Sequence, residues 1–187
     1  MRLILASASP RRSELLQSAG FACEVEPADI DEVPQEGEAP VAYTLRVARE
    51  KAETVAARHR GEEDVVVLGA DTEVVRGQRI LGKPSDVAGA RRMLEMLSGQ
   101  DHWVYTGVVV IGPGHQASEV GSTLVSFSPM TPEEIEWYLE SGEPMGKAGA
   151  YAIQGLGARF IERIEGSWSN VVGLPIAIVH RLLREVQ

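Results

Sequence analysis

A continuous apolar segment, Val65-Val66-Val67-Leu68, is the feature that most constrains the fold of this chain. A β-branched run of this kind is typical of a central strand buried on both faces, with helices covering the sheet. Segments with helical periodicity lie both before and after it. The pattern therefore predicts an α/β protein, and residues 1–187 are expected to form a single domain.

A carboxylate follows this strand closely, in the stretch Gly69-Ala70-Asp71-Thr72. A carboxylate beside an apolar strand is unfavourable unless it is paired or binds a metal. Asp71 is therefore the best candidate for a general base or a metal ligand. The alternative is an Asp-Thr turn that bonds its own backbone, and this stretch alone favours neither interpretation.

The N-terminal stretch Ala6–Arg12 predicts a sharp turn from a strand, Arg2–Ala6, into a helix. Ser9 occupies an N-cap position before a proline, and two arginines, Arg11 and Arg12, fall in the first helical turn. The helix dipole disfavours each of these cations by roughly 0.3–1 kcal/mol. Free backbone amides, the hydroxyls of Ser7 and Ser9, and the guanidinium groups together indicate an anion site. An exposed helix start with solvated arginines is an equally good interpretation.

A long helix begins at Pro40, and its apolar stripe predicts one buried face made of Val41, Leu45, Ala48, Ala52 and Val55. Lys51 lies at the edge of this stripe, where it can reach toward a cleft. The pattern alone favours a surface lysine with a buried stem. An acidic segment precedes the helix, and it is interpreted mainly as a solvated loop from which one carboxylate can hold a metal. Its carboxylates are Glu24, Glu26, Asp29, Asp31 and Glu32.

The remaining segments of the chain predict alternating strands and helices. A hairpin turn, residues 76–78, leads to Lys83 on a Gly/Pro-bounded turn near Asp71. A capped helix over residues 87–97, a capping box at Thr131 and a C-terminal amphipathic helix follow. Strands are expected over residues 21–25, 102–111, 117–127 and 161–164. The buried positions of the two longer helices are expected to be Val87, Ala90, Leu94, Leu97, Ile176, Val179, Leu182, Leu183 and Val186.

The glycine-rich stretch from Gly142 to Gly157 lets the backbone approach a ligand closely. It is not a P-loop, because only three residues separate its first two glycines and no Ser or Thr follows the lysine. It is not a dinucleotide-binding fingerprint either, because the third small residue of that motif is missing. The prediction is a flexible loop that carries Lys147 and Gln154, with a plain connecting loop as the alternative.

Charge and composition limit the partners of this chain. A formal net charge of -9 argues against nonspecific binding to nucleic acid or to an anionic membrane, so a polyanionic ligand needs local cations or a metal. The single cysteine and the absence of a signal-peptide pattern indicate a reducing, cytoplasmic location. No zinc motif is present, so the expected metal is Mg²⁺ or Mn²⁺ bound by carboxylates. These features together point to metal-assisted phosphoryl chemistry on a small phosphorylated molecule.

Motifs spread over nearly the whole chain resemble the Maf family of nucleotide pyrophosphatases. The matching blocks are Ser7-Ala-Ser-Pro-Arg-Arg12, Gly69-Ala-Asp71-Thr72, Leu81-Gly-Lys83-Pro84, Lys147-Ala-Gly-Ala-Tyr151-Ala-Ile-Gln154-Gly, and Asn170-Val-Val-Gly173. The resemblance implies an elongated mixed β-sheet flanked by helices, with two lobes and a central cleft, as in the inosine-triphosphate pyrophosphatase group. It also implies metal-dependent hydrolysis of a nucleoside triphosphate to a monophosphate and pyrophosphate.

The resemblance also assigns expected roles to single residues. Asp71 matches the catalytic base, whereas Arg11, Thr72 and Gln154 match positions tied to substrate choice. Other active-site positions match Arg12, Glu32, Lys51 and Lys83, with Ser7 and Ser9 in the binding turn. Asp71 or Glu32 would hold the divalent metal.

The loop around Gln154 resembles the dTTP/UTP branch of the family rather than the branch that acts on 7-methyl-GTP. A side-chain amide both donates and accepts hydrogen bonds, as the edge of thymine or uracil requires. This chemistry and the resemblance together predict a cytoplasmic enzyme for dTTP, UTP and modified pyrimidine nucleotides, and the resemblance alone implies a homodimer with a house-cleaning role. The alternatives are a 7-methyl-GTP-type enzyme and a septum regulator that binds cell-division proteins.

Overall fold

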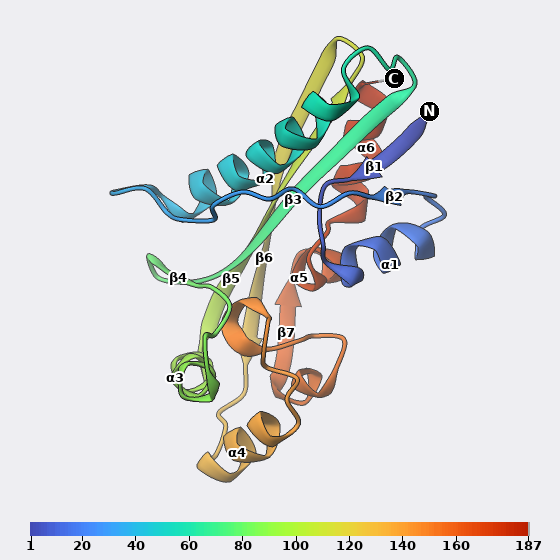
Figure 1. Ribbon diagram of the computed structural model, residues 1–187. Coiled ribbons are helices and arrows are strands. Elements are labelled where there is room, and N and C mark those ends of the chain that lie inside the picture. Colours follow the sequence, from blue (N-terminus) through green and yellow to red (C-terminus); the bar gives the residue numbers. More distant parts are fainter. Residues whose placement is uncertain (187) are drawn as a thin grey trace.

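The chain folds around a seven-stranded sheet with the strand order β2-β1-β3-β5-β6-β7, and β4 pairs with β3 (Figure 1). This computed structural model describes residues 1–186. The strands are β1 (Arg2–Leu5), β2 (Glu24–Val25), β3 (Val65–Arg76), β4 (Arg79–Leu81), β5 (Asp101–Gly112), β6 (His115–Phe127) and β7 (Ile161–Glu165). The helices are α1 (Pro10–Ser18), α2 (Pro40–Ala56), α3 (Val87–Leu97), α4 (Pro132–Glu140), α5 (Trp168–Val172) and α6 (Ile176–Glu185).

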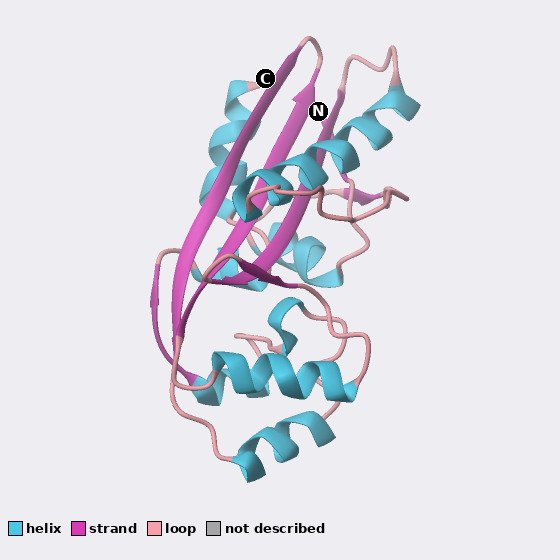
Figure 2. Ribbon diagram, turned by 90° about the vertical axis from the view of Figure 1, so that its left-hand side faces the viewer, coloured by secondary structure: helices cyan, strands magenta, loops and turns pink. Residues whose placement is uncertain are grey.

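The sheet is mixed, as expected. β1 runs parallel to β2 and β3, whereas β3 runs antiparallel to β4 and β5, β5 to β6, and β6 to β7. The long strands β3, β5 and β6 extend through the length of the molecule and give it an elongated shape (Figure 2). None of the helices in residues 1–186 combines the length and apolar character that crossing a membrane requires.

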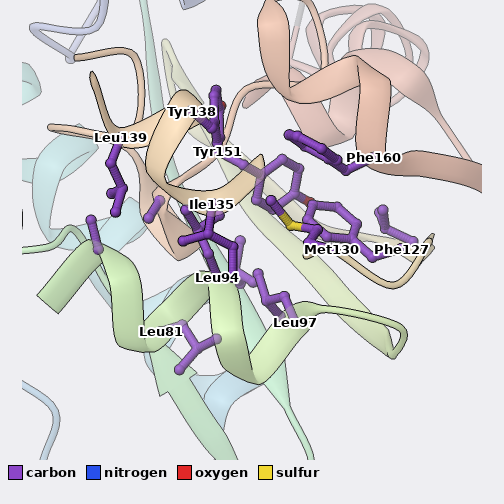
Figure 3. Packing of buried hydrophobic residues seen from close by; sticks show 14 of the residues in the cluster. Leu81, Leu94, Leu97, Phe127, Met130, Ile135, Tyr138, Leu139, Tyr151 and Phe160 are labelled. Atoms are coloured by element: carbon purple, nitrogen blue, oxygen red, sulfur yellow. The ribbon is translucent and has the colours of Figure 1, made fainter. Parts of the chain in front are cut away.

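Separate apolar clusters lie at the two ends of the long strands and define the two lobes. At one end, α2 covers one face of the sheet, while α1 and α6 cover the other. At the other end, α3, α4 and the glycine-rich segment enclose a third cluster (Figure 3), which contains Leu94, Leu97, Phe127, Ile135, Tyr138, Tyr151 and Phe160. The predicted two-lobed, helix-flanked sheet is therefore confirmed.

Helix α2 packs unusually close to the sheet. A side-chain carbon at Gly69 on β3 would lie 2.7 Å from the Ala52 Cβ and 2.8 Å from its nitrogen, distances that atoms in contact do not reach. Glycine at this position therefore lets the helix approach the strand. Lys51 is the residue immediately before Ala52, so this close approach brings its side chain to the middle of β3, where it pairs with Asp71.

Three details of the predicted elements are wrong. Asp71 does not follow the central strand or form a turn, because β3 continues from Val65 through Asp71 to Arg76. Val41 and Val87 are 41% and 52% exposed rather than buried, since each lies in the first turn of its helix, before the helix reaches its packing partner. The strand expected over residues 21–25 is reduced to Glu24–Val25.

Candidate active site

The sheet has a gap along one edge of β3. β1 pairs with Val65–Leu68 and β4 pairs with Val74–Arg76, so residues 69–73 have no strand partner on this side. At this edge the Leu68 carbonyl accepts a hydrogen bond from the Ala6 amide. Because the backbone groups of a strand alternate in direction, those of Ala70 and Thr72 also face the gap. We call residues 69–73 the open edge of β3.

A cleft of about 520 Å³ lies over this open edge, a volume within the usual range for small-molecule sites. Residues from both lobes line it. All ten candidate residues from the sequence analysis lie on its walls: Ser7, Ser9, Arg11, Arg12, Glu32, Lys51, Asp71, Thr72, Lys83 and Gln154. The structure thus brings the candidates together, although they come from segments far apart in the chain.

Asp71 and Lys51 form a buried ion pair at the base of the cleft. The Lys51 ammonium lies 2.8 Å from Asp71 Oδ1 and 2.6 Å from Glu32 Oε1, and both Lys51 and Asp71 are buried. Lys51 is therefore not the surface lysine that the helix pattern favoured. The second carboxylate oxygen of Asp71, Oδ2, is buried and has no hydrogen-bond partner among the described residues.

Glu32 comes from the acidic segment that precedes α2. The Tyr43 hydroxyl donates to the Glu32 carbonyl at 3.1 Å and so attaches this segment to the helix. Burial raises the pKa of Glu32, but the hydrogen bond and charge of Lys51, together with the charges of Lys83 and Arg12, bring the pKa below its ordinary value. Glu32 is therefore ionised at neutral pH and shares Lys51 with Asp71.

Glu73 is a cleft residue that the sequence analysis missed. Burial, followed by the nearby charges of Asp71 and Glu32, raises the pKa of Glu73 to about 8. Its Oε2 atom is buried and also lacks a hydrogen-bond partner within residues 1–186. Strand alternation was the signal that could have found it: once β3 continues through Asp71, residue 73 lies on the same face.

Arg12 connects three parts of the site. Its side chain donates to Ser7 Oγ at 2.8 Å, Thr72 Oγ1 at 3.0 Å and the Gly173 carbonyl at 2.9 Å. Burial lowers the pKa of this guanidinium, which nevertheless remains charged at neutral pH. Three of the five N–H groups of an arginine are thus used within the protein. The interpretation of Arg12 as a solvated arginine is wrong.

Thr72 belongs to the same network. Its hydroxyl lies 3.0 Å from Thr106 Oγ1 and donates to the Gly173 carbonyl at 3.2 Å, in addition to accepting from Arg12. The hydroxyl is therefore occupied by protein groups, and the main chain of Thr72 is the part that faces the open edge. This network holds the α1 turn against β3 and the end of α5.

The α1 turn presents its N-terminus to the cleft. Ser9 occupies the N-cap position with Pro10 at the start of the helix, as predicted, but its side chain makes no capping bond. The Ser9 amide instead donates to Ser7 Oγ at 3.3 Å. Arg11 makes no ion pair with any residue that the structure describes. These features leave helix amides and a guanidinium group available to an anion.

The glycine-rich segment is folded rather than a flexible or plain connecting loop. It contains two short 3₁₀ turns, Ala148–Ala150 and Leu156–Phe160, and Ala150–Ile153 are buried. Tyr151 is anchored in the distal core, where its hydroxyl lies 2.8 Å from His102 Nε2. The prediction of flexibility fails because the small apolar residues between the glycines pack into that core.

This segment brings a further cation to the cleft. The Lys147 ammonium donates to the Glu143 carbonyl at 2.6 Å, and burial together with the charge of Arg11 lowers the pKa of Lys147. Lys147 and Arg11 therefore face the same region from opposite lobes. Lys83 lies on the turn after β4, and its charge lowers the pKa of Glu32.

The donor set suits a hard divalent cation. No three His, Cys, Asp or Glu side chains within residues 1–186 form a ready-made metal cluster. The free oxygen of Asp71, with Glu32 beside it, can instead contribute one or two carboxylates. Mg²⁺ is commonly held in this way, by one or two carboxylates together with water and substrate phosphates.

The fold and the cleft place this chain among α/β proteins with a cation-rich cleft around a buried aspartate. More specifically, the chain belongs to the family described as Maf-like protein, whose model matches residues 2–186. Three relatives named dTTP/UTP pyrophosphatase illustrate the similarity. The relative from Koribacter versatilis is 51% identical over 98% of this chain and 94% of its own length. The relatives from Myxococcus xanthus and Vibrio parahaemolyticus are 52% and 48% identical, over 97% and 99% of this chain and 90% and 97% of their own lengths.

Solved structures agree on the fold. The Ham1 protein of Staphylococcus aureus superposes with a TM-score of 0.51 at 12% identity, over the full length of both chains. A protein from Vibrio cholerae superposes with a TM-score of 0.50 at 14% identity, over 99% of this chain and 98% of the other. At these identities the likeness concerns the fold alone.

Proposed function

We propose that this protein is a nucleoside triphosphate pyrophosphatase that hydrolyses dTTP and UTP to the monophosphate and pyrophosphate, with residues 1–187 acting as one domain. The observation that carries the proposal is the meeting of Arg11, Lys51 and Lys83 around Asp71 in one cleft. In a chain with a net charge of -9, such a concentration of cations fits a polyphosphate ligand. Relatives about half identical to the chain are named for this activity.

In the proposed reaction, Asp71 activates the attacking water. Lys51 occupies Oδ1, so Oδ2 is the oxygen with a free lone pair to accept a proton from water. The hydroxide attacks the α-phosphorus, the bond from that phosphorus to the bridging oxygen breaks, and pyrophosphate leaves. Arg11, Lys83 and Lys147 stabilise the negative charge on the phosphate oxygens.

A divalent cation, Mg²⁺ or Mn²⁺, is proposed to bind at Asp71 and Glu32. When bound, it supplies Lewis-acid stabilisation of the phosphate oxygens. Lys51 lies between the two carboxylates and keeps them in place. Asp71 has a single free oxygen, Oδ2, so it serves either as the base described above or as a metal ligand, and in the first case Glu32 is the carboxylate left for the metal.

Substrate choice is proposed to depend on Gln154, Thr72 and Arg11. Gln154 is exposed on the cleft wall, where its amide can both donate to and accept from a uracil or thymine edge. Arg12, Ser7 and Ser9 position the α1 turn that receives the phosphates.

The test is pyrophosphate release across a panel of standard and modified nucleotides, with and without Mg²⁺ or Mn²⁺. We expect UTP and dTTP to be the best substrates and activity to require the metal. Asp71→Asn should lower kcat by at least about 100-fold, the loss typical of a missing general base. The protein should still fold, because Glu32 remains paired with the Lys51 ammonium. Faster turnover of GTP or 7-methyl-GTP would overturn the substrate assignment.

The same variant separates catalysis from a binding role in septum formation. A regulator that acts by binding cell-division proteins would keep its cellular effect in Asp71→Asn, whereas an enzyme would lose it. A homodimer in the cytoplasm is proposed from the family resemblance, and light scattering of the purified protein tests the dimer.

A further inference from the structure

Glu143, just beyond α4, holds the glycine-rich segment by its side chain. Its Oε1 atom accepts from the Tyr138 hydroxyl at 2.7 Å and from the Gly157 amide at 3.0 Å, and Oε2 accepts from the Leu156 amide at 3.0 Å. Although burial raises the pKa of Glu143, these hydrogen bonds lower it more, so the group is a carboxylate at neutral pH. One carboxylate therefore fixes the end of the segment.

Tyr138 binds the same segment a few residues earlier, at Ala152. Its hydroxyl donates to Glu143 and accepts from the Ala152 amide at 3.1 Å. A phenol and a carboxylate thus bind main-chain amides at positions 152, 156 and 157. We call this pair, Tyr138 and Glu143, the α4 clamp.

Gln154 lies between the clamped positions. Its side chain is exposed, so core packing does not fix where its amide lies, and that position depends on the backbone on either side. A side-chain carbon at Gly155 would collide with the Glu143 carboxylate, which shows how closely the clamp lies against this backbone. Lys147 is attached to the same residue through the Glu143 carbonyl.

A hydrogen-bonding amide discriminates between bases only when its donor and acceptor stay in place, because small displacements remove the advantage of orientation. We propose that Glu143 is a positioning residue that sets the specificity of the cleft, by fixing the backbone that carries Gln154 against the base of the nucleotide. The proposal rests on the proposed function and adds a residue that does not itself touch the substrate.

The variant Glu143→Gln tests the proposal with little change in shape. The glutamine amide has one acceptor oxygen, and its NH₂ group would face an N–H donor, so at least one clamp bond is lost. Glu140→Gln, an exposed position on α4, is the matched control. Tyr138→Phe removes the link to Ala152 and should reproduce the effect in part.

Two measurements are made on each full-length protein. The first is the ratio of kcat/KM for UTP to kcat/KM for CTP. These two nucleotides differ at the base edge to which a side-chain amide would hydrogen-bond. We expect the ratio to fall about tenfold in Glu143→Gln and to stay unchanged in Glu140→Gln. The second is the rate of trypsin cleavage after Arg159, an exposed residue two positions beyond the clamped Gly157 amide, followed by mass spectrometry. This rate should rise at least about tenfold in Glu143→Gln, rise less in Tyr138→Phe and stay unchanged in Glu140→Gln.

An unchanged UTP/CTP ratio in Glu143→Gln, or an equal loss of activity on both nucleotides, would overturn the proposal. If the wild-type protein releases no pyrophosphate from any nucleotide, the proposed function fails instead. In that case calorimetry measures the ratio of the UTP and CTP affinities in wild type and in Glu143→Gln. A fall of this ratio in the variant supports the positioning role of Glu143, and an unchanged ratio overturns it.

Discussion

The ammonium nitrogen of Lys51 lies 2.8 Å from Asp71 Oδ1, and both side chains are buried between α2 and the open edge of β3. Each charge offsets the cost of burying the other, so removing one partner leaves an uncompensated buried charge. Glu32, whose side chain is 39% exposed, adds a weaker, solvent-screened contact to the same ammonium.

We therefore expect Lys51→Met to lower the free energy of unfolding by about 3–5 kcal/mol. Urea denaturation measures this change. The double variant Lys51→Met/Asp71→Asn should recover much of the loss, since it removes the unpaired charge at Asp71. Equal stability of the single and double variants would show that the pair does not couple.

The Arg12 network predicts a different kind of loss. Arg12→Lys keeps the charge but cannot donate to Ser7, Thr72 and Gly173 together, so we expect a destabilisation of about 1–3 kcal/mol. Arg11→Lys is the control, because Arg11 is only half-buried and lacks such a network. It should leave the melting temperature nearly unchanged and weaken nucleotide binding. The same loss of stability in both variants would contradict this account.

Glu73 predicts a pH dependence of stability. Its pKa of about 8 in the folded protein exceeds its ordinary value of 4.5, so the folded state binds the proton more tightly. Its favourable contribution is complete below about pH 4.5 and is lost as the pH rises to about 8. It faces Asp71 and Glu32, which raise its pKa, and Lys51 and Lys83, which lower it.

Glu73→Gln should remove this dependence. In metal-free buffer, the stability of the variant relative to wild type should rise between pH 5 and pH 8, by roughly 1.4 kcal/mol for each unit of pKa difference. Chemical denaturation at several pH values measures it, with the exposed Glu63→Gln as control. A constant difference across this range would mean that Glu73 titrates normally.

His102 predicts the opposite trend at acid pH. Burial lowers its pKa to about 4, so the folded state disfavours the proton. The stability contributed by His102 is present above about pH 6.5 and is lost as the pH falls toward 4. Its Nε2 atom lies 2.8 Å from the Tyr151 hydroxyl, and a glutamine side chain at position 102 can also hydrogen-bond to this hydroxyl.

We expect His102→Gln to lose less stability than wild type between pH 6.5 and pH 4, with the difference between the two proteins reporting this residue alone. Thermal melts across the range measure the difference. His180→Gln, an exposed histidine on α6, is the control. Parallel losses in wild type and His102→Gln would rule out a buried neutral histidine.

Much of the fold was predictable because it depends on local patterns. The β-branched run at Val65–Leu68, the capping box at Thr131 and the Pro10 helix start each indicate an element within a few residues, and all three were confirmed. The family resemblance then implied the mixed sheet, the flanking helices and the two lobes. Helix faces were less well predicted: Val41 and Val87 fit an apolar stripe but lie where no partner covers them.

The candidate site depended on contacts between distant segments. Motifs identified Asp71, but nothing near it in sequence showed that Lys51 would be its partner, since that pairing requires α2 to cross β3 closely at Gly69. Glu73 was missed because its role depends on the strand continuing through Asp71.

The sequence by itself determined the strands, the helix starts and the residue types available for phosphoryl chemistry, because these follow from periodicity, capping and side-chain chemistry within short windows. Only the tertiary structure decided which charges are buried together and which backbone is held rigid. The sheet and α2 bring Lys51, Asp71 and Glu73 together, and the α4 clamp fixes the backbone around Gln154. Loss of solvent and the attraction between charges depend on distance in space, and distance along the chain does not determine them.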